Sequence, residues 1–410
     1  MQITKIYAQN YKGFKNLELN LNKLNVLIGK NGSGKSTITR LITLIIESLK
    51  FTGEDVINFS PLGIDIAGRY SELSYNGNDA GTIMLGAQFN IENEIYTFKT
   101  TLIYSTELNK VIVSKFEWFN NDESQFKCDL NSYKNREPVY VIGDEERSVI
   151  FNGLLPNVEN TEFPLHRVKG LYKLYFSVNE LKRCLTYLGP FRNGLSRVYG
   201  VNLGSKSNVG PRGEFAPYIL NQDRNNPTME LHKKIESWMS LHFDGKYIYC
   251  DGQEPYFSLK VKSDVYSSNI VDDGVGYSQL FPLIVSRFSK LLNDSYGVEI
   301  VEQPELHLHP AVCGSVGDLY LDSFSENNNT VVLETHSKEL LLRLRRRVAE
   351  GGIKGLENDI SIVYVYKSGD SCCVDYINIL RSGHVNWWPR GVFEESFDEV
   401  LAITEANNAN

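Results

Sequence analysis

A glycine-rich run at residues 29–36 constrains the fold of this chain more strongly than any other feature. It reads Gly-Lys-Asn-Gly-Ser-Gly-Lys-Ser and matches the pattern G-x-x-x-x-G-K-[ST] in full. The apolar residues 24–28 before it predict a buried strand, and residues 37–49 after it carry apolar side chains near helical spacing. A strand, a glycine loop and a helix in this order predict a phosphate-binding loop. A chance glycine-rich turn is the alternative.

The chemistry of such a loop assigns its residues. Glycines let backbone N–H groups surround a phosphate, and the start of the following helix adds positive potential. Lys35 would reach the β- and γ-phosphates of a nucleotide, and Ser36 would offer its hydroxyl to Mg²⁺. The predicted nucleotide-binding residues of the loop are Gly29, Asn31, Gly32, Ser33, Gly34, Lys35, Ser36 and Thr37.

A second motif, residues 298–305, places acidic residues after an apolar strand. Glu302 ends that strand, where a phosphate-loop enzyme needs a carboxylate to hold Mg²⁺. The next position normally holds a glutamate that polarises the attacking water, but here it is Gln303. A glutamine amide orients water but cannot accept its proton, and Glu305 is a possible substitute. The predicted catalytic residues are therefore Glu302, Gln303 and Glu305, with Ser36 and Glu302 as metal ligands.

A third motif, residues 272–279, reads Asp-Asp-Gly-Val-Gly-Tyr-Ser-Gln just before a predicted helix. Its glycines and serine at a helix N-terminus favour a second anion site, with Gly276 and Ser278 as the binding residues. An ordinary N-capped helix after a glycine turn is the alternative. The position of this motif, roughly twenty residues before the strand that ends in Glu302, favours the anion site.

A fourth motif, residues 333–337, places His336 directly after another predicted strand. A histidine at that point can donate a hydrogen bond to a γ-phosphate and so report its presence. A purely structural histidine is the alternative, and the presence of the other three motifs in the same chain favours the catalytic role.

Composition excludes some classes of protein. The chain has 410 residues, a formal net charge of −8 and scattered cysteines, and it contains no run of eighteen apolar residues. We therefore expect a cytoplasmic protein with reduced thiols and no membrane span. The negative charge argues against a surface coated in positive charge for nucleic acid, although a local basic patch remains open.

The four motifs in this order resemble the ABC-type ATPases. The run Glu-Gln-Pro-Glu-Leu-His-Leu-His-Pro at 302–310 is similar to predicted ATPases related to the RecF, SMC and OLD proteins, in particular to a standalone subgroup without a nuclease domain. Further matching segments are 10–14, 187–192, 210–214, 334–340 and 388–393.

The resemblance implies an α/β fold, namely an ABC-type P-loop ATPase head with an antiparallel β subdomain and a helical or mixed insertion lobe. Residues 1–105 would hold the first part of the ATPase core, 106–265 the insertion lobe, and 266–410 the rest of the core. Asn31, Lys35 and Ser36 would contact ATP or Mg²⁺ in one copy, and Gly276 and Ser278 would contact the γ-phosphate bound by a second copy. His336 would sense that phosphate, and Lys12 would lie near the nucleotide.

The resemblance also implies partners. Two copies would dimerise head to tail on ATP, and the dimer would regulate a separate effector, plausibly a nuclease in anti-phage defence or DNA maintenance. An ATP-locked scaffold that barely hydrolyses, or an SMC-like DNA-repair clamp, are alternatives. The glutamine of the usual loop between the lobes has only weak candidates, Gln88 and Gln125, and residues 187–192 are the alternative for that region.

Three other features leave alternatives open. Arg192 is either a phosphate or interface contact or a surface arginine after a proline turn. His307 and His309 allow a metal interpretation, but no further ligand is grouped near them, and the resemblance places them in a dimer-contacting loop. The basic cluster Arg343, Arg345, Arg346 and Arg347 is either a solvated helix end or a contact to DNA or a partner.

Overall fold

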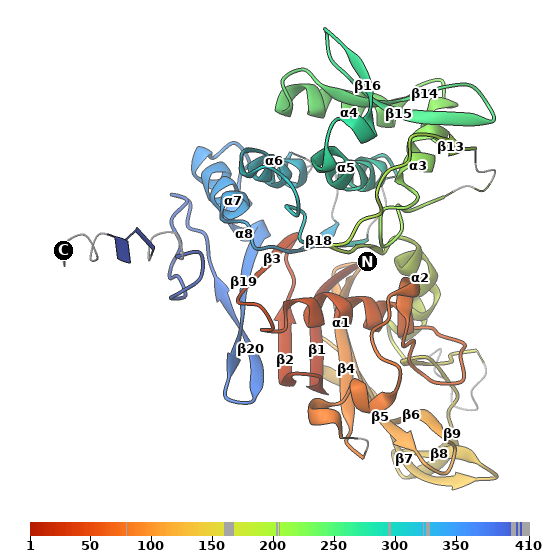
Figure 1. Cartoon of the computed structure of the whole chain (residues 1–410). Coiled ribbons are helices and arrows are strands. Elements are labelled where there is room, and N and C mark those ends of the chain that lie inside the picture. The colour runs from red at the N-terminus through yellow and green to blue at the C-terminus, as the bar shows by residue number, and fades with distance from the viewer. Residues whose placement is uncertain are drawn as a thin grey trace.

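The computed structural model describes residues 1–78, 80–159, 168–201, 204, 206–293, 297–322, 324, 329–394, 399–400 and 402–403. Within these residues the centre of the molecule is a six-stranded sheet (Figure 1). Its strand order is β12 (Thr186–Leu188), β17 (Val298–Glu302), β18 (Thr330–Glu334), β3 (Leu24–Ile28), β19 (Ile360–Ser368) and β20 (Ser371–Ile377). All neighbours are parallel except β20, which pairs antiparallel with β19. The carboxyl ends of β3, β17 and β18 therefore meet at one edge of this sheet.

A second, antiparallel sheet lies below α1 in Figure 1. Its order is β2 (Phe14–Asn20), β1 (Gln2–Tyr11), β4 (Ile83–Ile91), β5 (Glu94–Ser105), β6 (Lys110–Asn120), β7 (Glu123–Lys134), β8 (Glu137–Ile142) and β9 (Glu145–Ser148). The sheet continues across residue 105, because the turn after β5 returns the chain into an antiparallel pairing with β6. Strand β12, also from the expected insertion lobe, pairs with β17 of the central sheet. The three-part division of the chain stays a prediction.

Helices cover both faces of the central sheet. Helix α1 (Lys35–Ser48) and α2 (Leu171–Arg183) lie toward the antiparallel sheet, and α5 (Val275–Leu292), α6 (Pro310–Leu321) and α7 (Lys338–Glu350) lie on the other face. Above α5 in Figure 1, a smaller lobe combines α3 (Ala216–Arg224) and α4 (Glu230–His242) with β13 (Tyr199–Gly200), β14 (Tyr247–Asp251), β15 (Tyr256–Lys262) and β16 (Ser267–Asn269). The remaining short elements are β10 (Phe151–Asn152), β11 (Leu155–Pro156) and α8 (Leu356–Asp359).

Alternation along the buried strands divides the interior into two cores. In β3, Leu27 packs with α1 and the antiparallel sheet, whereas Val26 and Ile28 pack with α5, α6 and α7. In β18, Val332 joins the first core and Leu333 the second. Since successive strand residues point to opposite faces, a continuous apolar strand supplies both cores at once. This is why the run before the glycine loop is apolar at nearly every position.

The elements expected from the sequence are largely present. The strand predicted at 24–28 is confirmed as β3, and the helix predicted at 37–49 corresponds to α1. Helix α5 begins earlier than expected, at Val275 inside the third motif. The glycine-, serine- and asparagine-containing stretch 202–213 also predicts a loop, of which residues 202, 203 and 205 lie outside the described residues. In the described part of the chain, every helix is too short or too polar to cross a membrane.

A buried ion pair connects α5 to β17. Arg287 is 2% exposed and Glu299 is 0% exposed, and Arg287 Nη1 lies 3.2 Å from Glu299 Oε2. Ser286 also donates to Glu299, and the guanidinium lies over the ring of Tyr320. Charges removed from water to this extent depend on each other, because either one alone would be buried without compensation.

We predict that Arg287→Met lowers the free energy of unfolding by about 3–5 kcal/mol, because it leaves the Glu299 charge buried without its partner. The double variant Arg287→Met/Glu299→Leu should recover most of this loss. Arg381→Met is the matched control, since Arg381 forms an exposed ion pair with Glu357 and its loss should cost less than about 1 kcal/mol. Urea unfolding measures all three, and a double variant as unstable as the single one would contradict the argument.

Candidate functional site: a phosphate loop above two carboxylates

The glycine loop adopts a backbone that only glycine tolerates at two points. Gly29 has φ 148°, and a Cβ there would lie 2.1 Å from the carbonyl oxygen of Val365. Gly34 has φ 108°, and a Cβ there would lie 3.1 Å from Phe14 in β2 and 3.2 Å from Cys372 in β20, so these two strands support the loop. The sequence therefore shapes the loop as an open cradle that leads directly into α1.

Lys35 points back into this cradle. Its Nζ donates to the carbonyl oxygens of Gly29 (3.0 Å) and Lys30 (3.1 Å), and the residue is 4% exposed. Burial lowers the pKa of Lys35, while the nearby carboxylate of Glu334 partly offsets this effect. The hydroxyl of Ser33 is buried in the same loop without a hydrogen-bond partner. A lysine held on loop carbonyls and an unpartnered hydroxyl both fit a phosphate, which would supply stronger acceptors to each.

Two carboxylates lie side by side beneath the loop. Glu302 and Glu334 end β17 and β18 and are register partners in the parallel pair. Glu302 Oε1 accepts from Thr39 Oγ1 (2.5 Å) and from Tyr187 OH (2.7 Å). Ser36 Oγ donates to Glu334 Oε1 at 2.9 Å.

This pair is buried and electrostatically costly. Glu302 is 2% and Glu334 3% exposed, and Oε2 of Glu334 has no hydrogen-bond partner. Burial raises the pKa of Glu334 to about 7, and the neighbouring charge of Glu302 adds to the effect. Hydroxyl and carboxylate oxygens are the ligands that Mg²⁺ prefers, so the residues present fit the metal expected beside a bound nucleotide.

Gln303 follows Glu302 in a left-handed conformation, φ 45°. Its N–H donates to the carbonyl oxygen of Glu334 at 2.7 Å. Arg192 Nη2 donates to the carbonyl oxygens of Glu302 (3.1 Å) and Gln303 (3.2 Å). Its Nη1 donates to the carbonyl oxygen of Gln279 in α5 (3.5 Å). Arg192 is 7% exposed, and burial lowers its pKa to about 10. The alternative of a surface arginine is therefore wrong, because the proline turn directs this side chain inward, where it joins α5 to the end of β17.

His336 lies at the open end of β18 and remains exposed. Burial lowers its pKa, and so does the positive charge of Lys35, which places His336 in the electrostatic field of the loop. Its backbone N–H donates to Glu305 Oε1 at 2.6 Å. The other oxygen of Glu305 is buried without a hydrogen-bond partner, and burial raises the pKa of this carboxyl. Glu305 therefore holds the backbone at His336 and keeps one acceptor atom available.

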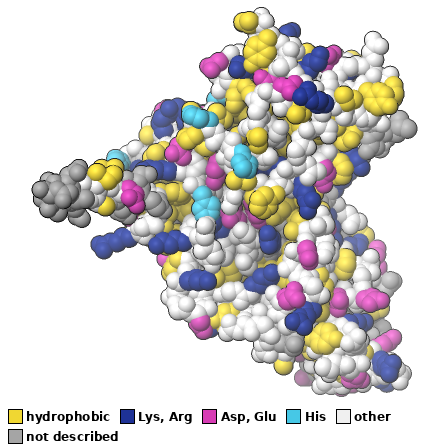
Figure 2. All heavy atoms as spheres, in the orientation of Figure 1, with side chains coloured by type: hydrophobic (Ala, Val, Ile, Leu, Met, Phe, Trp, Pro, Cys, Tyr) yellow, Lys and Arg dark blue, Asp and Glu magenta, His cyan; other side chains and the backbone are white. Residues whose placement is uncertain are grey.

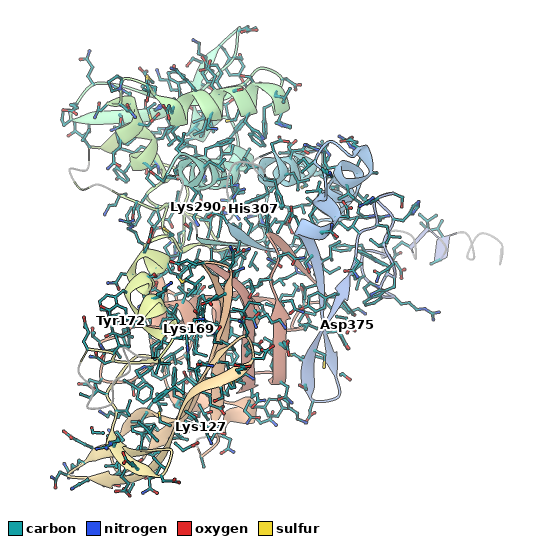
Figure 3. All side chains as sticks on the ribbon, turned by 180° about the vertical axis from the view of Figure 1, so that it is seen from behind. Lys127, Lys169, Tyr172, Lys290, His307 and Asp375 are labelled. Atoms are coloured by element: carbon teal, nitrogen blue, oxygen red, sulfur yellow. The ribbon has the colours of Figure 1, made fainter. Side chains whose placement is uncertain are left out.

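The third motif begins α5 on the face of the central sheet opposite α1. Gly274 has φ 93° just before the helix, and Ser278 is half-buried in its first turn. A Cβ at Gly276 would lie 3.7 Å from the carbonyl oxygen of His307, so this turn packs beside the loop after β17. Figure 3 labels His307 at the level where α5 and α6 meet the central sheet. Figure 2 shows several histidine side chains exposed on this part of the surface.

The structure places the remaining sequence candidates as follows. Lys12 lies in the turn after β1 and donates to the carbonyl oxygen of Ile66 at 2.8 Å; burial lowers its pKa, and so does the charge of Arg40. Gln88 is buried within β4 and bonds Thr4 and Thr97, and Gln125 lies in β7. His309 caps α6, because its Nδ1 accepts from the N–H of Ala311.

The arginines of α7 form ion pairs and hydrogen bonds within the protein. Arg343 and Arg347 both pair with the buried Asp318 of α6, and Arg347 also reaches Asp322 at 2.8 Å. Arg346 pairs with Glu350, and Arg345 donates to the carbonyl oxygen of Gly383. Neither a solvated helix end nor a contact to DNA or a partner describes this cluster fully. The acids that pair with it lie on α6, and sequence spacing could not reveal that α6 lies beside α7.

The sequence assigned no role to Thr39, Arg40 or Glu334, and it placed Tyr187 only in the segment 187–192, yet the structure brings all four into the site. Thr39 and Tyr187 bind Glu302, Glu334 binds Ser36, and Arg40 lies close enough to Glu302 and Tyr187 to interact with their charges. Glu334 did have a signal in the sequence, because it is a charged residue at the end of an apolar strand, two positions before His336. The partners of Tyr187 and Arg40 depend on strand order and had no signal in the sequence.

Comparisons with known proteins agree with this geometry. Residues 1–180 match the family model described as AAA ATPase domain (AAA_15). The fold is similar to the Smc head in a crystal structure with the C-winged helix domain of ScpA, with 12% identity, 92% of this chain and 99% of that chain covered, and a TM-score of 0.53. No curated protein matches the chain.

Two further solved structures share smaller similarity. An Smc head with an extended coiled coil, bound to the C-terminal domain of ScpA from Pyrococcus furiosus, has 11% identity, covers 98% of this chain and 99% of that one, and gives a TM-score of 0.48. The SMC head domain from Thermotoga maritima has 11% identity, 92% and 100% coverage, and a TM-score of 0.43. The similarity to the first Smc head confirms the fold predicted from the sequence, which is that of an ABC-type, SMC-like P-loop ATPase head.

Proposed function

We propose that this protein binds ATP with a divalent cation, dimerises on it, hydrolyses it slowly, and so regulates a separate effector protein. The observation that carries the proposal is the meeting of Lys35, Ser36, Glu302 and His336 at the carboxyl ends of β3, β17 and β18, with Ser36 bonded to the neighbouring carboxylate Glu334. In open α/β sheets, ligands bind at this end of the strands.

The residues of the site divide the chemistry among them. Lys35 would leave the loop carbonyls for the β- and γ-phosphates, and backbone N–H groups at the start of α1 would hold the same phosphates. A bound Mg²⁺ would neutralise charge that develops on the phosphate oxygens. Gln303 would orient the attacking water, and Glu305 supplies a nearby carboxylate with one unpartnered oxygen as a substitute proton acceptor. Slow hydrolysis follows from the absence of a carboxylate at position 303.

Dimerisation is supported by the placement of the third motif. Lys35 begins α1 and Ser278 lies in the first turn of α5, and these helices pack on opposite faces of one sheet, which supports a role for Ser278 at the nucleotide of a second copy. Large apolar side chains are exposed in and beside the motif, namely Val275 (61%) and Val271 (38%), and Phe191 (81%) precedes Arg192, which contacts α5. Grouped exposed apolar side chains favour an interface, here with a second copy whose bound ATP would contact Ser278.

The effector is proposed from resemblance. The similar Smc head was solved with a domain of another protein, ScpA, which supports a head that acts through a partner. We propose a nuclease in anti-phage defence or DNA maintenance as that partner. The ATP-locked scaffold is the second candidate, favoured by Gln303. An SMC-like clamp on DNA receives less support, because Arg343 and Arg347 of α7 are already paired with Asp318.

The proposal predicts that ATP and Mg²⁺ shift the mass of the protein in solution from 46.6 kDa toward twice that value. Ser278→Arg should stay monomeric while still binding ATP, because the loop and its cation site are intact. Ser382→Arg, on the exposed C-terminal segment, is the matched control and should dimerise. Light scattering with a fluorescent ATP analogue measures both properties, and a Ser278→Arg dimer as stable as the wild type would refute the proposed interface.

A further inference from the structure

Glu334 is a buried acid that the proposed function does not require. The established pattern for a phosphate loop needs one carboxylate, and Glu302 at the end of β17 fills that position. Glu334 is its register partner on β18, and Ser36 and Thr39 of α1 bond Glu334 and Glu302 respectively. Both carboxylates therefore lie on the α1 face of the sheet, directly under the phosphate loop.

Only one of the two carboxylate oxygens of Glu334 has a hydrogen-bond partner. Oε1 accepts from Ser36 Oγ, whereas Oε2 is buried with no hydrogen-bond partner, and the residue is 3% exposed. Lys35, the nearest loop cation, donates to the carbonyl oxygens of Gly29 and Lys30 instead. In the part of the chain that the structure describes, Glu334 forms no ion pair with lysine or arginine. A second carboxylate in this position repels Glu302 and loses its hydration, and the charges of Lys35 and Arg40 offset these costs only in part.

A cation between the two strand ends would remove both costs. Hard divalent cations bind carboxylate and hydroxyl oxygens, and the three side chains that meet here offer those atoms alone. The hydroxyl of Ser36 is a donor to Glu334 in the empty site, and its oxygen lone pairs stay available to a metal ion. The geometry therefore accounts for the unpartnered oxygen if it is a ligand position.

We propose that Glu334 is a ligand of the divalent cation that accompanies ATP, so that Ser36, Glu302 and Glu334 together form the protein side of the metal site. This inference rests on the proposed ATP binding. In this arrangement, binding of the cation relieves the unfavourable burial of the Glu334 charge. The site is electrostatically unfavourable when empty and favourable when the cation is present. A structural residue that only positions Ser36 would have the opposite effect on the empty protein.

Glu334→Gln tests this directly, because the amide keeps the shape and can still accept from Ser36 while the charge is removed. Binding of a fluorescent ATP analogue is measured with Mg²⁺ and with EDTA. Mg²⁺ should increase the affinity of the wild type for the analogue, and this increase should be about 10–100-fold smaller in the variant. Its affinity in EDTA should be unchanged or higher, since a negative charge near the phosphates is gone. Glu350→Gln, an exposed carboxylate at the far end of α7, is the matched control.

Thermal unfolding without metal or nucleotide supplies a second readout. Removing the repulsion should raise the unfolding midpoint of Glu334→Gln by about 2 °C or more. A lower midpoint with equal losses of affinity in Mg²⁺ and EDTA would show a structural role and overturn the inference. An unchanged Mg²⁺ effect would also overturn it while leaving ATP binding intact. A wild type that binds no nucleotide would instead refute the proposed function.

A more conservative change covers the case in which Glu334→Gln does not fold. Glu334→Asp keeps the charge but withdraws the carboxylate by one methylene. The gain in affinity that Mg²⁺ produces should be smaller for this variant than for the wild type, but greater than zero. A gain equal to that of the wild type would count against Glu334 as a direct ligand.

Discussion

Lys35→Ala should reduce ATP turnover at least about 10²–10³-fold, because it removes the positive charge directed at the phosphates where charge develops during hydrolysis. The fold should survive, since Lys35 forms hydrogen bonds only to loop carbonyls that water can satisfy once the side chain is gone. Phosphate release from purified protein measures the effect, and circular dichroism checks the fold.

Lys30→Ala is the matched control for this result. Lys30 lies in the same loop with an exposed side chain, and only its backbone carbonyl meets Lys35. Its removal should leave turnover nearly unchanged. If the wild type itself releases no more phosphate than Lys35→Ala while still binding ATP, the ATP-locked scaffold becomes the better description of this protein.

Gln303→Glu should raise ATP turnover by about 10²-fold, because a carboxylate accepts the proton of the attacking water and an amide cannot. The backbone at this position is held by Arg192 and by the carbonyl oxygen of Glu334, so the new side chain should occupy the place of the old one. Single-turnover phosphate release measures the chemical step separately from product dissociation.

Gln253→Glu makes the same chemical change on the exposed surface of the upper lobe and should not alter turnover. An unchanged rate for Gln303→Glu, with ATP binding and dimerisation intact, would count against position 303 as the water site. Glu305 would then be the better base, and Glu305→Gln should abolish what turnover remains.

Much of the site could be predicted because its parts are local. The phosphate loop and the strand and helix that flank it occupy residues 24–49, so spacing alone reveals them. His336 and Glu302 could be found because each follows an apolar strand, and parallel strands present their carboxyl ends together. The start of α5 was placed too late because Val275 and Gly276 are poor helix formers whose first turn is stabilised by packing against the loop at His307.

The sequence by itself determined the phosphate loop, the order of the four motifs and the class of fold, because each depends on residues that are neighbours along the chain. Tertiary structure alone decided that Glu334 lies beside Glu302, that Arg192 turns inward to join α5 to β17, and that the arginines of α7 meet Asp318. These contacts join residues far apart in sequence, and they exist only once the order and register of the strands bring them together.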